Sequence, residues 1–330
     1  MTADGLTHPE LLLALQRGLP LVPRPFAALG ERLGLGETAV LDCVTGMIQS
    51  GTARRLGAVF DSRSLGYVST LCAADVPPAK LAEVAARLTP HAGITHCYER
   101  EGRPNLWFTL TAPKEQMATE RARIAAVLNP HELLDLPSVR TFKIEAVFDT
   151  RSIDGHADPQ KSQVRVRHLY QPRALEMRER TVVRRFQDSI PLVPEPFTVL
   201  GNELGWATKD LLALLAQWRE SGILRRIGLI VRHRELGFAA NGMGVWLVDP
   251  LHTAEAGRVL AGFPEVTHCY ERGLHALFPF NLFAMIHAGS RDDLYRLWER
   301  MTATAGLKAG QLLVSAREFK KSSPRFFEEP

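Results

Sequence analysis

The sequence predicts an α+β protein made of two tandem copies of one module, each a winged helix-turn-helix followed by a ferredoxin-like βαββαβ domain. Three observations lead to this fold class. The string His-Cys-Tyr-Glu-Arg occurs twice, at residues 96–100 and 268–272. The residues around it recur at offsets of 171 to 176. Helical and strand patterns also follow one another in the same order in both halves, as expected for duplication and fusion of one module.

The repeated blocks extend well beyond that string. They include Leu-Val-Pro-x-Pro-Phe at 21–26 and 192–197, Arg-Arg followed by an aliphatic residue and Gly at 54–57 and 225–228, and Asn-Leu with an aromatic residue at 105–107 and 281–283. Because these blocks keep their order and nearly their spacing, the two halves predict two domains related by a pseudo-twofold axis.

The opening of each copy predicts three short helices and a β wing. In the first copy the helices are expected over 9–17, 25–33 and 37–49, separated by glycines, and the wing over 53–60. The second copy repeats this punctuation over 184–231. Three helices with a tight turn and a wing describe a winged helix-turn-helix.

The rest of each copy predicts strands and helices in the order βαββαβ, which is the ferredoxin-like arrangement. In the first copy the expected elements cover 67–73, 77–88, 94–100, 106–111, 116–128 and 139–148. In the second copy they cover 239–248, 253–261, 266–272, 280–287, 291–303 and 311–319.

These elements predict five segments. They are a first winged helix-turn-helix at 1–60, a first ferredoxin-like domain at 61–150, a linker at 151–180 with its most polar stretch at 154–171, a second winged helix-turn-helix at 181–233 and a second ferredoxin-like domain at 234–330. The two halves are expected to pair through their sheets as an intrachain pseudo-dimer, with ligands in the groove between sheets and wings.

Composition narrows the class of protein. Of the 330 residues, 45% are hydrophobic and 23% are charged, which is typical of soluble globular proteins. No apolar run reaches the roughly 18 residues of a membrane span, and no signal peptide pattern opens the chain, so no membrane partner is expected. Four scattered cysteines favour a reducing, cytoplasmic location over a disulfide framework. The net charge of +4 mildly favours an anionic ligand.

The module order resembles that of the Lrp/AsnC transcription regulators, which makes DNA binding the first alternative to consider. A recognition helix needs basic or amide side chains at its start. The first copy instead offers Glu37 and Asp42 there, and the second copy offers Lys209 beside Asp210. Acids repel phosphates, so we expect no specific binding of duplex DNA.

The repeated string places three polar side chains on one face of a strand. Alternate residues share a face, so His96, Tyr98 and Arg100 point one way, in a row about 13 Å long, and Cys97 points the other way. The second copy presents His268, Tyr270 and Arg272 in the same manner. A structural zinc site is not expected, because no further Cys or His lies at a zinc-like spacing. A single His could still ligate the iron of a tetrapyrrole.

The residues beyond the fold resemble the siroheme decarboxylases, which are built from Lrp/AsnC-like modules. The resemblance rests on His-Cys-Tyr-Glu-Arg, on Asn-Leu-Trp-Phe-Thr at 105–109, on Arg-Arg-Leu-Gly-Ala at 54–58 and on Arg-Glu-Phe-Lys-Lys-Ser-Ser at 317–323. Two halves in one chain resemble the fused form tied to haem d1 biosynthesis and denitrification. The second copy departs by an insertion at 274–279 and by Phe-Ala-Met at 283–285, so its site need not equal the first.

The resemblance implies a carboxy-lyase that removes the carboxyl groups of two acetate side chains of siroheme, on rings C and D, to give didecarboxysiroheme. His96 and His268 are then the candidate proton donors, or axial ligands to the substrate iron, and Tyr98 and Tyr270 hold or relay the proton. The expected substrate-binding residues are Arg54, Arg55, Arg100, Arg225, Arg226, Arg272, Lys143, Lys320, Asn105, Asn281 and Trp107. Phe108, Phe142 and Phe283 are further candidates for walls around the macrocycle.

The same resemblance sets expectations for ligands and partners. Siroheme is the expected small-molecule substrate, and no cofactor is expected beyond the substrate's own iron tetrapyrrole. A further copy of the chain or related decarboxylase subunits are the other partners to consider. Two alternatives from other classes remain open at this point: a DNA-binding regulator, and a haem-binding sensor without turnover that the same His and Arg residues would permit.

Overall fold

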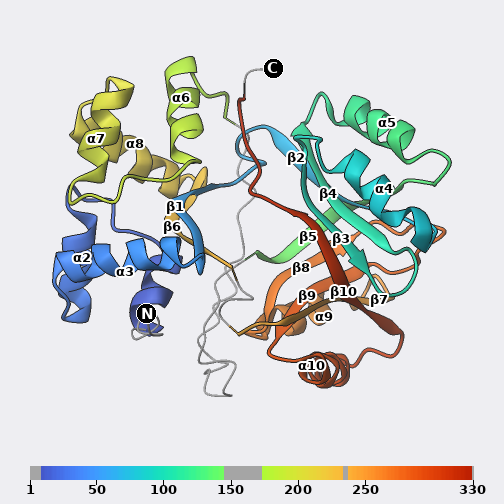
Figure 1. The fold of residues 1–330 in the computed structure, drawn as a ribbon. Coiled ribbons are helices and arrows are strands. Elements are labelled where there is room, and N and C mark those ends of the chain that lie inside the picture. Colours follow the sequence, from blue (N-terminus) through green and yellow to red (C-terminus); the bar gives the residue numbers. More distant parts are fainter. Residues whose placement is uncertain (1–8, 145–172, 233–236, 329–330) are drawn as a thin grey trace.

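The computed structural model of the chain describes residues 9–144, 173–232 and 237–328. Figure 1 shows two lobes side by side, a helical lobe with a small sheet and a β barrel clad in helices. Each lobe contains elements from both sequence copies, the first coloured from blue to green and the second from yellow-green to red. The copies are therefore interleaved along the whole molecule. The predicted polar linker at 154–171 lies outside the described residues.

The helical lobe contains three helices from each copy. The first copy supplies α1 (Pro9–Arg17), α2 (Pro25–Leu33) and α3 (Glu37–Gln49), which match the predicted ranges, and the second supplies α6 (Met177–Phe186), α7 (Pro196–Leu204) and α8 (Thr208–Glu220). Proline begins α2 and α7, where its missing N–H costs nothing. Their buried faces pack into one shared hydrophobic core.

Two equivalent glycines set the tight turn between the second and third helices of each copy. A Cβ on Gly30 would lie 2.5 Å from the carbonyl oxygen of Leu35, and one on Gly201 would lie 2.7 Å from that of Trp206. Only glycine permits the backbone to approach so closely. This turn is the feature that gives each copy its helix-turn-helix geometry.

The wing of each copy is a single strand, and the other copy completes it. Strand β1 (Ala53–Phe60) pairs antiparallel with β6 (Leu224–Val231), and Gly57 lies opposite Gly228 at the centre of the pair. The chain also crosses over just after the first helix of each copy. The amide of Leu19 donates to Ile227 in β6 at 2.7 Å, and the amide of Ile190 donates to Leu56 in β1 at 2.8 Å. Each strand of this two-stranded sheet therefore also accepts a backbone hydrogen bond from the segment that follows the first helix of the other copy.

The second lobe is a closed barrel of eight strands in the order β10-β3-β4-β2-β5-β8-β9-β7. The first copy contributes β2 (Tyr67–Ala74), β3 (Ile94–Arg100), β4 (Leu106–Pro113) and β5 (Leu134–Ile144); the second contributes β7 (Ala240–Trp246), β8 (Val266–Arg272), β9 (Leu282–Ala288) and β10 (Gly310–Lys321). Helices α4 (Pro78–Leu88) and α5 (Met117–Leu128) cover the first copy's strands, and α9 (Thr253–Gly262) and α10 (Arg291–Thr304) cover the second copy's. The order of elements is the predicted βαββαβ in both copies.

The last strand of each copy joins the two sheets. The first half of β5 pairs with β2 of its own copy, and the second half pairs with β8 of the other copy. Strand β10 does the same with β7 and β3. The two halves therefore pair through their sheets, as predicted. The sheets join edge to edge into one barrel because each last strand is long enough to pair with both, and closure leaves no open edge.

Three hydrophobic cores result from this closure. Two lie between the sheet and its covering helices, and the third fills part of the barrel interior with residues from both copies, Trp107, Phe278, Phe283 and Leu313 among them. Phe278 comes from the insertion in the second copy and contacts Trp107, with ring centroids 5.2 Å apart. The insertion therefore helps to fill the barrel.

Two boundaries differ clearly from the prediction. Strand β5 begins at Leu134 instead of residue 139, and helix α6 begins at Met177 instead of residue 184; the other strand ends that can be compared lie within two residues of the predicted ones. The predicted end of β5 at 148 lies outside the described residues. No helix in the described part of the chain is long and apolar enough to cross a membrane.

Candidate active site

The two repeated strings lie on β3 and β8 and turn their polar side chains toward the barrel interior. The rings of His96 and Tyr98 stack at a centroid distance of 6.3 Å, and the Arg100 guanidinium lies 5.4 Å from the Tyr98 ring. The interleaved Cys97 is buried in the outer core beneath the helices. The predicted division of the strand into two faces is therefore found in the structure.

The second string repeats this arrangement. His268 and Tyr270 stack at 6.1 Å, and the guanidinium of Arg272 lies 4.7 Å from the Tyr270 ring. Cys269 is buried on the opposite face of β8. Two matched His-Tyr-Arg rows thus line one barrel.

A β-bulge precedes each histidine and brings a threonine hydroxyl to its ring. The pairing register shifts between Ile94 and His96 and between Val266 and His268. A bulge breaks the strict alternation of side chains, so consecutive residues can meet. Nδ1 of His96 lies 3.0 Å from the hydroxyl of Thr95, and Nδ1 of His268 lies 3.0 Å from that of Thr267. In both histidines Nε2 is the ring nitrogen that takes no part in the contact with the threonine.

Both imidazoles are half-buried and surrounded by positive charge. Burial, and then the field of Lys321, His268, Arg54 and Arg100, lowers the pKa of His96 to about 3. Burial also lowers the pKa of His268 to about 4, with Arg225 as the next cause and Lys321 among the others. Lys321 acts on both rings, and His268 acts on His96, so the two rows converge on one cationic region. Both imidazoles are neutral at neutral pH before any ligand binds.

The first arginine of each wing pair belongs to this region. Arg54 donates from Nη1 to the backbone carbonyl of Lys321 at 2.7 Å. Arg225, its counterpart, forms an ion pair of 2.7 Å with Asp61. Both guanidiniums depress the pKa of the histidine of their own copy.

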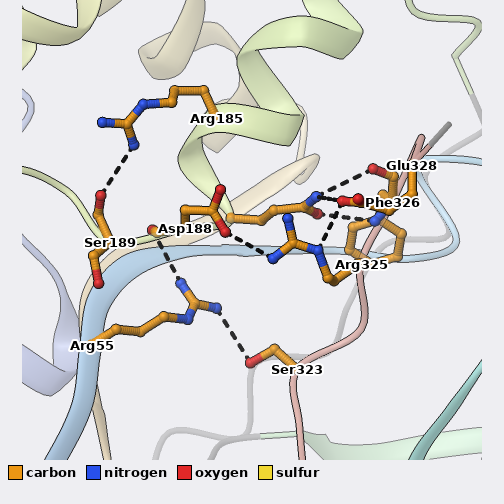
Figure 2. Close-up of polar contacts among 9 residues, drawn as sticks. Arg55, Arg185, Asp188, Ser189, Ser323, Arg325, Phe326 and Glu328 are labelled. Atoms are coloured by element: carbon orange, nitrogen blue, oxygen red, sulfur yellow. Dashed lines mark hydrogen bonds and ion pairs between the residues drawn. The ribbon is translucent and has the colours of Figure 1, made fainter. Parts of the chain in front are cut away.

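The second arginine of the first pair has a different set of partners. Arg55 donates to the carbonyl of Asp188 at 3.4 Å and to the hydroxyl of Ser323 at 3.3 Å, and Figure 2 shows it joining the turn after α6 to the C-terminal tail. A Cβ on Gly57 would lie 2.0 Å from the Arg55 guanidinium, so this glycine makes room for it. In the second copy, Arg226 lies beside the equivalent turn, where a Cβ on Gly18 would lie 3.2 Å from its own.

Arg100 and Arg272 lie deeper and tie the two copies together. Arg100 donates to the carbonyl of Leu313 at 3.2 Å and to the hydroxyl of Ser315 at 2.9 Å, and Arg272 donates to the carbonyl of Leu136 at 2.7 Å. Burial lowers the pKa of each guanidinium to about 10, so both remain charged at neutral pH.

Four residues expected to bind substrate are hydrogen-bonded to backbone groups in the structure. The ammonium of Lys143 donates to the carbonyl of Phe263 at the end of α9, and that of Lys320 donates to two carbonyls after α4. Each asparagine clamps a backbone segment through both ends of its amide, Asn105 at Val76 and Asn281 at Val248. Ammonium groups are favoured at the carbonyl ends of helices. A side-chain amide whose oxygen and nitrogen are both hydrogen-bonded to the backbone has few hydrogen-bonding positions left for a ligand.

The expected aromatic walls are dispersed over the three cores. Trp107 is 1% exposed, lies inside the barrel and donates from Nε1 to the carbonyl of Pro104 at 2.7 Å. Phe283 shares that interior core, whereas Phe108 and Phe142 pack beneath the helices on the outside. The expectation for the latter two is wrong, because their strand positions face outward.

The two histidine sites are not equivalent, and the difference lies on the last strands. Opposite Tyr98 and His96, β10 places Glu318 and Lys321. At the same positions opposite Tyr270 and His268, β5 places Thr141 and Ile144. The Tyr98 hydroxyl lies 3.4 Å from the Glu318 carboxylate, and burial together with this neighbour raises the pKa of Tyr98.

Lys321 and Glu318 were absent from the residues expected from sequence. Their signal was present in the string Arg-Glu-Phe-Lys-Lys-Ser-Ser at 317–323. Aligning this string with the end of β5 would have shown that Lys143 matches Lys320 and that only the second lysine is peculiar to one site. Within the described residues, no group of three or more His, Cys, Asp or Glu side chains could hold a metal ion.

The fold and the site define the class: a tandem Lrp/AsnC-like protein whose duplicated histidine strands line one barrel. The family model of the AsnC-like ligand binding domain matches residues 64–143 and 235–320, and that of the siroheme decarboxylase NirDL-like HTH domain matches 9–54 and 179–225. The chain is 36% identical to a siroheme decarboxylase of Hydrogenobacter thermophilus, covering 98% of this chain and 96% of that protein. This chain belongs to the siroheme decarboxylase family.

Two further relatives agree with this assignment. A siroheme decarboxylase NirDL subunit of Paracoccus denitrificans is 36% identical over 97% of both chains. A crystal structure of the siroheme decarboxylase NirDL in co-complex with an iron-uroporphyrin III analogue matches with a TM-score of 0.73 at 33% identity, covering 97% of this chain and 94% of that one. The similarity therefore extends over both copies.

Proposed function

We propose that the chain removes carbon dioxide from the acetate side chains on rings C and D of siroheme, giving didecarboxysiroheme for haem d1 biosynthesis. The observation that carries the proposal is the convergence of two His-Tyr-Arg rows with Arg54, Arg225 and Lys321 on one region between the copies. The relative whose structure holds an iron-uroporphyrin III analogue supports a tetrapyrrole as the ligand.

The charge of the region suits the proposed substrate. Siroheme carries eight carboxylates, and half-buried guanidinium and ammonium groups bind carboxylates through charge-assisted hydrogen bonds. Arg54 and Lys321 are the first candidates, because the described contacts of Arg54 are with a carbonyl, whereas Arg225 already faces the Asp61 carboxylate. Arg100 and Arg272 keep their charge deeper in the barrel and hold the histidine strands in place.

The histidines supply the proton that the reaction requires. When the bond between the methylene and carboxyl carbons breaks, carbon dioxide leaves and the electron pair remains with the methylene carbon and the macrocycle. A proton delivered to that carbon completes the methyl group. A neutral imidazole is a poor acid, but bound carboxylates oppose the cations that lower its pKa. We propose that substrate binding protonates His96 and His268 and so arms them as donors.

The tyrosines and the substrate iron complete the proposal. Tyr98 and Tyr270 stack on the histidines, which supports a role for their hydroxyls in holding or relaying the proton. A neutral imidazole is also a good axial ligand, so a histidine that ligates the substrate iron is the alternative role. No cofactor beyond the substrate's own iron tetrapyrrole is part of the proposal.

The proposal includes neither duplex DNA as a specific ligand nor a second subunit as a required partner. We propose that duplex DNA is not a specific ligand, since the wings pair with each other and Glu37, at the start of α3, is joined to Arg24 in an ion pair. Some relatives are named as separate alpha and beta subunits. In this chain the two paired copies take the place of two such subunits. A further homo-oligomer is not required by this arrangement.

The decisive experiment is anaerobic incubation of the purified chain with siroheme, followed by mass analysis of the tetrapyrrole. Loss of two carboxyl groups is the expected result. His96→Ala and His268→Ala should retain the tetrapyrrole and lower the rate by about 10²–10⁴-fold, as for other general acids. Siroheme recovered intact, with its visible spectrum changed on binding, would favour the haem-binding sensor. A footprint on promoter DNA at physiological salt would favour the regulator.

A further inference from the structure

The second histidine site contains a buried hydrogen-bonded chain of three side chains. Nδ1 of His268 lies 3.0 Å from the Thr267 hydroxyl, and the same hydroxyl lies 3.1 Å from Nε2 of His287. Thr267 is 3% exposed and His287 is 7% exposed. A second imidazole thus stands behind the one proposed to transfer the proton, and nothing in the proposed reaction has yet used it.

The first site lacks this second imidazole. Backbone pairing gives the equivalence: the amide of His287 donates to Glu265, just before β8, and the amide of Thr111 donates to Gly93, just before β3. Thr111 therefore occupies the position of His287. Its hydroxyl is engaged 2.7 Å from that of Ser69, away from Thr95. The two copies share the His–Thr bond and differ in what lies beyond it.

The threonine couples the two imidazoles because it has a single hydroxyl hydrogen. If Thr267 donates this hydrogen to Nε2 of His287, its oxygen is left to accept a hydrogen from Nδ1 of His268. His268 then carries Nδ1–H in both its neutral and its protonated form, and Nε2 is the atom that gains and loses the proton. If Thr267 donates to His268 instead, the neutral ring must carry its hydrogen on Nε2.

We propose that His287 is a positioning residue that accepts the Thr267 hydroxyl and thereby fixes His268 as the Nδ1–H tautomer. This inference rests on the proposed function, and it assigns the histidine of the second site a defined proton-transfer atom. Third groups that orient a functional histidine act in the same way in other enzymes. His96, with Thr111 in place of His287, lacks that constraint. The duplicated sites thus differ in how firmly the proton donor is prepared.

The test combines substitutions at position 287 with nitrogen NMR of histidine-labelled full-length protein. In the unsubstituted chain the ¹⁵N shifts of His268 should show hydrogen on Nδ1. His287→Leu removes the acceptor and should convert His268 to a mixture of tautomers. His287→Gln places a carboxamide oxygen close to the position of the lost His287 Nε2 and should restore the Nδ1–H form of His268. His96 should be unchanged in both variants, and so should both histidines in the control Thr111→Val.

The same variants make a kinetic prediction. His287→Leu should lower the rate of one of the two decarboxylations by about 10- to 100-fold, the range known for groups that orient metal-ligating histidines, with little change in KM. His287→Gln should recover most of this loss. If His287→Leu fails to fold, Thr267→Val removes the hydroxyl that links His268 to His287, and Thr267→Ser keeps that hydroxyl.

Two results would overturn the inference: an unchanged His268 tautomer in both His287→Leu and Thr267→Val, or hydrogen on Nε2 in the unsubstituted chain. Absence of decarboxylation by the unsubstituted chain would instead overturn the proposed function, and the NMR result would still decide the role of His287.

Discussion

Lys321 lies directly opposite His96 where β10 pairs with β3, and it contributes to the depressed pKa of both His96 and His268. At the matching position on β5, opposite His268, stands Ile144. A single ammonium group, contributed by one copy, therefore lowers the pKa of both histidines. Duplication has produced a nearly symmetric frame, and one side chain on the last strand breaks the symmetry of charge.

Replacing Lys321 by Ile, the residue of the other copy, should weaken binding of iron-uroporphyrin III by about 10-fold. A charge-assisted hydrogen bond contributes about 1.5–3 kcal/mol, and the half-buried position of Lys321 favours the lower end. Lys321→Arg should retain most of the affinity. Titration followed by absorbance measures the effect, with Lys308→Ala as the exposed control. Equal affinities for Lys321→Ile and the control would remove Lys321 from the substrate site.

The two arginines of the first wing pair should separate into a ligand-binding and a structural residue. Arg54→Ala should weaken iron-uroporphyrin III binding by about 10-fold or more, because this guanidinium lies beside the histidine region. Arg54→Lys should recover only part, since an ammonium lacks the planar fork. Arg55→Ala, matched in size and charge, should leave the dissociation constant within about 3-fold. The opposite order of the two effects would show that the substrate binds on the other side of β1.

The C-terminal tail should detach when its anchor is removed. Phe326 is 2% exposed, its ring lies 5.0 Å from that of Tyr67, and Gln187 bonds both its amide and its carbonyl. Figure 2 shows how Arg325 and Asp188 continue this attachment. Phe→Ala at a buried site costs about 3–5 kcal/mol. Phe326→Ala should therefore accelerate hydrogen exchange at the amide of Phe327, which donates to the Tyr67 hydroxyl at 2.8 Å.

The exposed Glu328→Gln provides the control for the tail, since it removes a charge without emptying a buried position. Unchanged exchange at Phe327 in Phe326→Ala would mean that the polar contacts alone hold the tail. Because Ser323 bonds Arg55 and Lys321 precedes it by two residues, detachment is also expected to loosen the wing-facing end of the site.

Local patterns predicted the elements of this fold, the face of the strings and the pairing of the halves through their sheets, but not the closure of the two sheets into one barrel. Helices α1, α2 and α3 lie where proline starts and glycine breaks place them, and His96, Tyr98 and Arg100 share a face because strands alternate. Barrel closure depends on β5 and β10 pairing with the other copy, more than a hundred residues away, for which a single sequence contains no local signal.

Bulges explain the site residues that sequence reasoning missed. The register of β10 shifts between Glu318 and Lys320, so the alternation that a regular strand would follow does not hold there. Lys320 therefore faces the carbonyl end of α4, and Lys321 comes to lie on the face of His96. The bulges at Thr95 and Thr267 likewise bring neighbouring side chains together that a period of two would separate.

Binding of the anionic tetrapyrrole should take up protons from solution. Without ligand, burial and neighbouring cations hold the pKa of His96 at about 3 and that of His268 at about 4, so neither ring is protonated near pH 6.5. Bound carboxylates oppose those cations and raise both pKa values, so the complex carries more protons than the separate partners. Isothermal titration of iron-uroporphyrin III in buffers of different ionisation enthalpy measures this number. We expect net uptake that declines as pH rises from about 6 to 8, and that is lost in the double variant His96→Gln, His268→Gln. Net proton release in the unsubstituted chain would mean that substrate carboxylates, and not the histidines, titrate on binding, and the role of proton donor would then fall to another group.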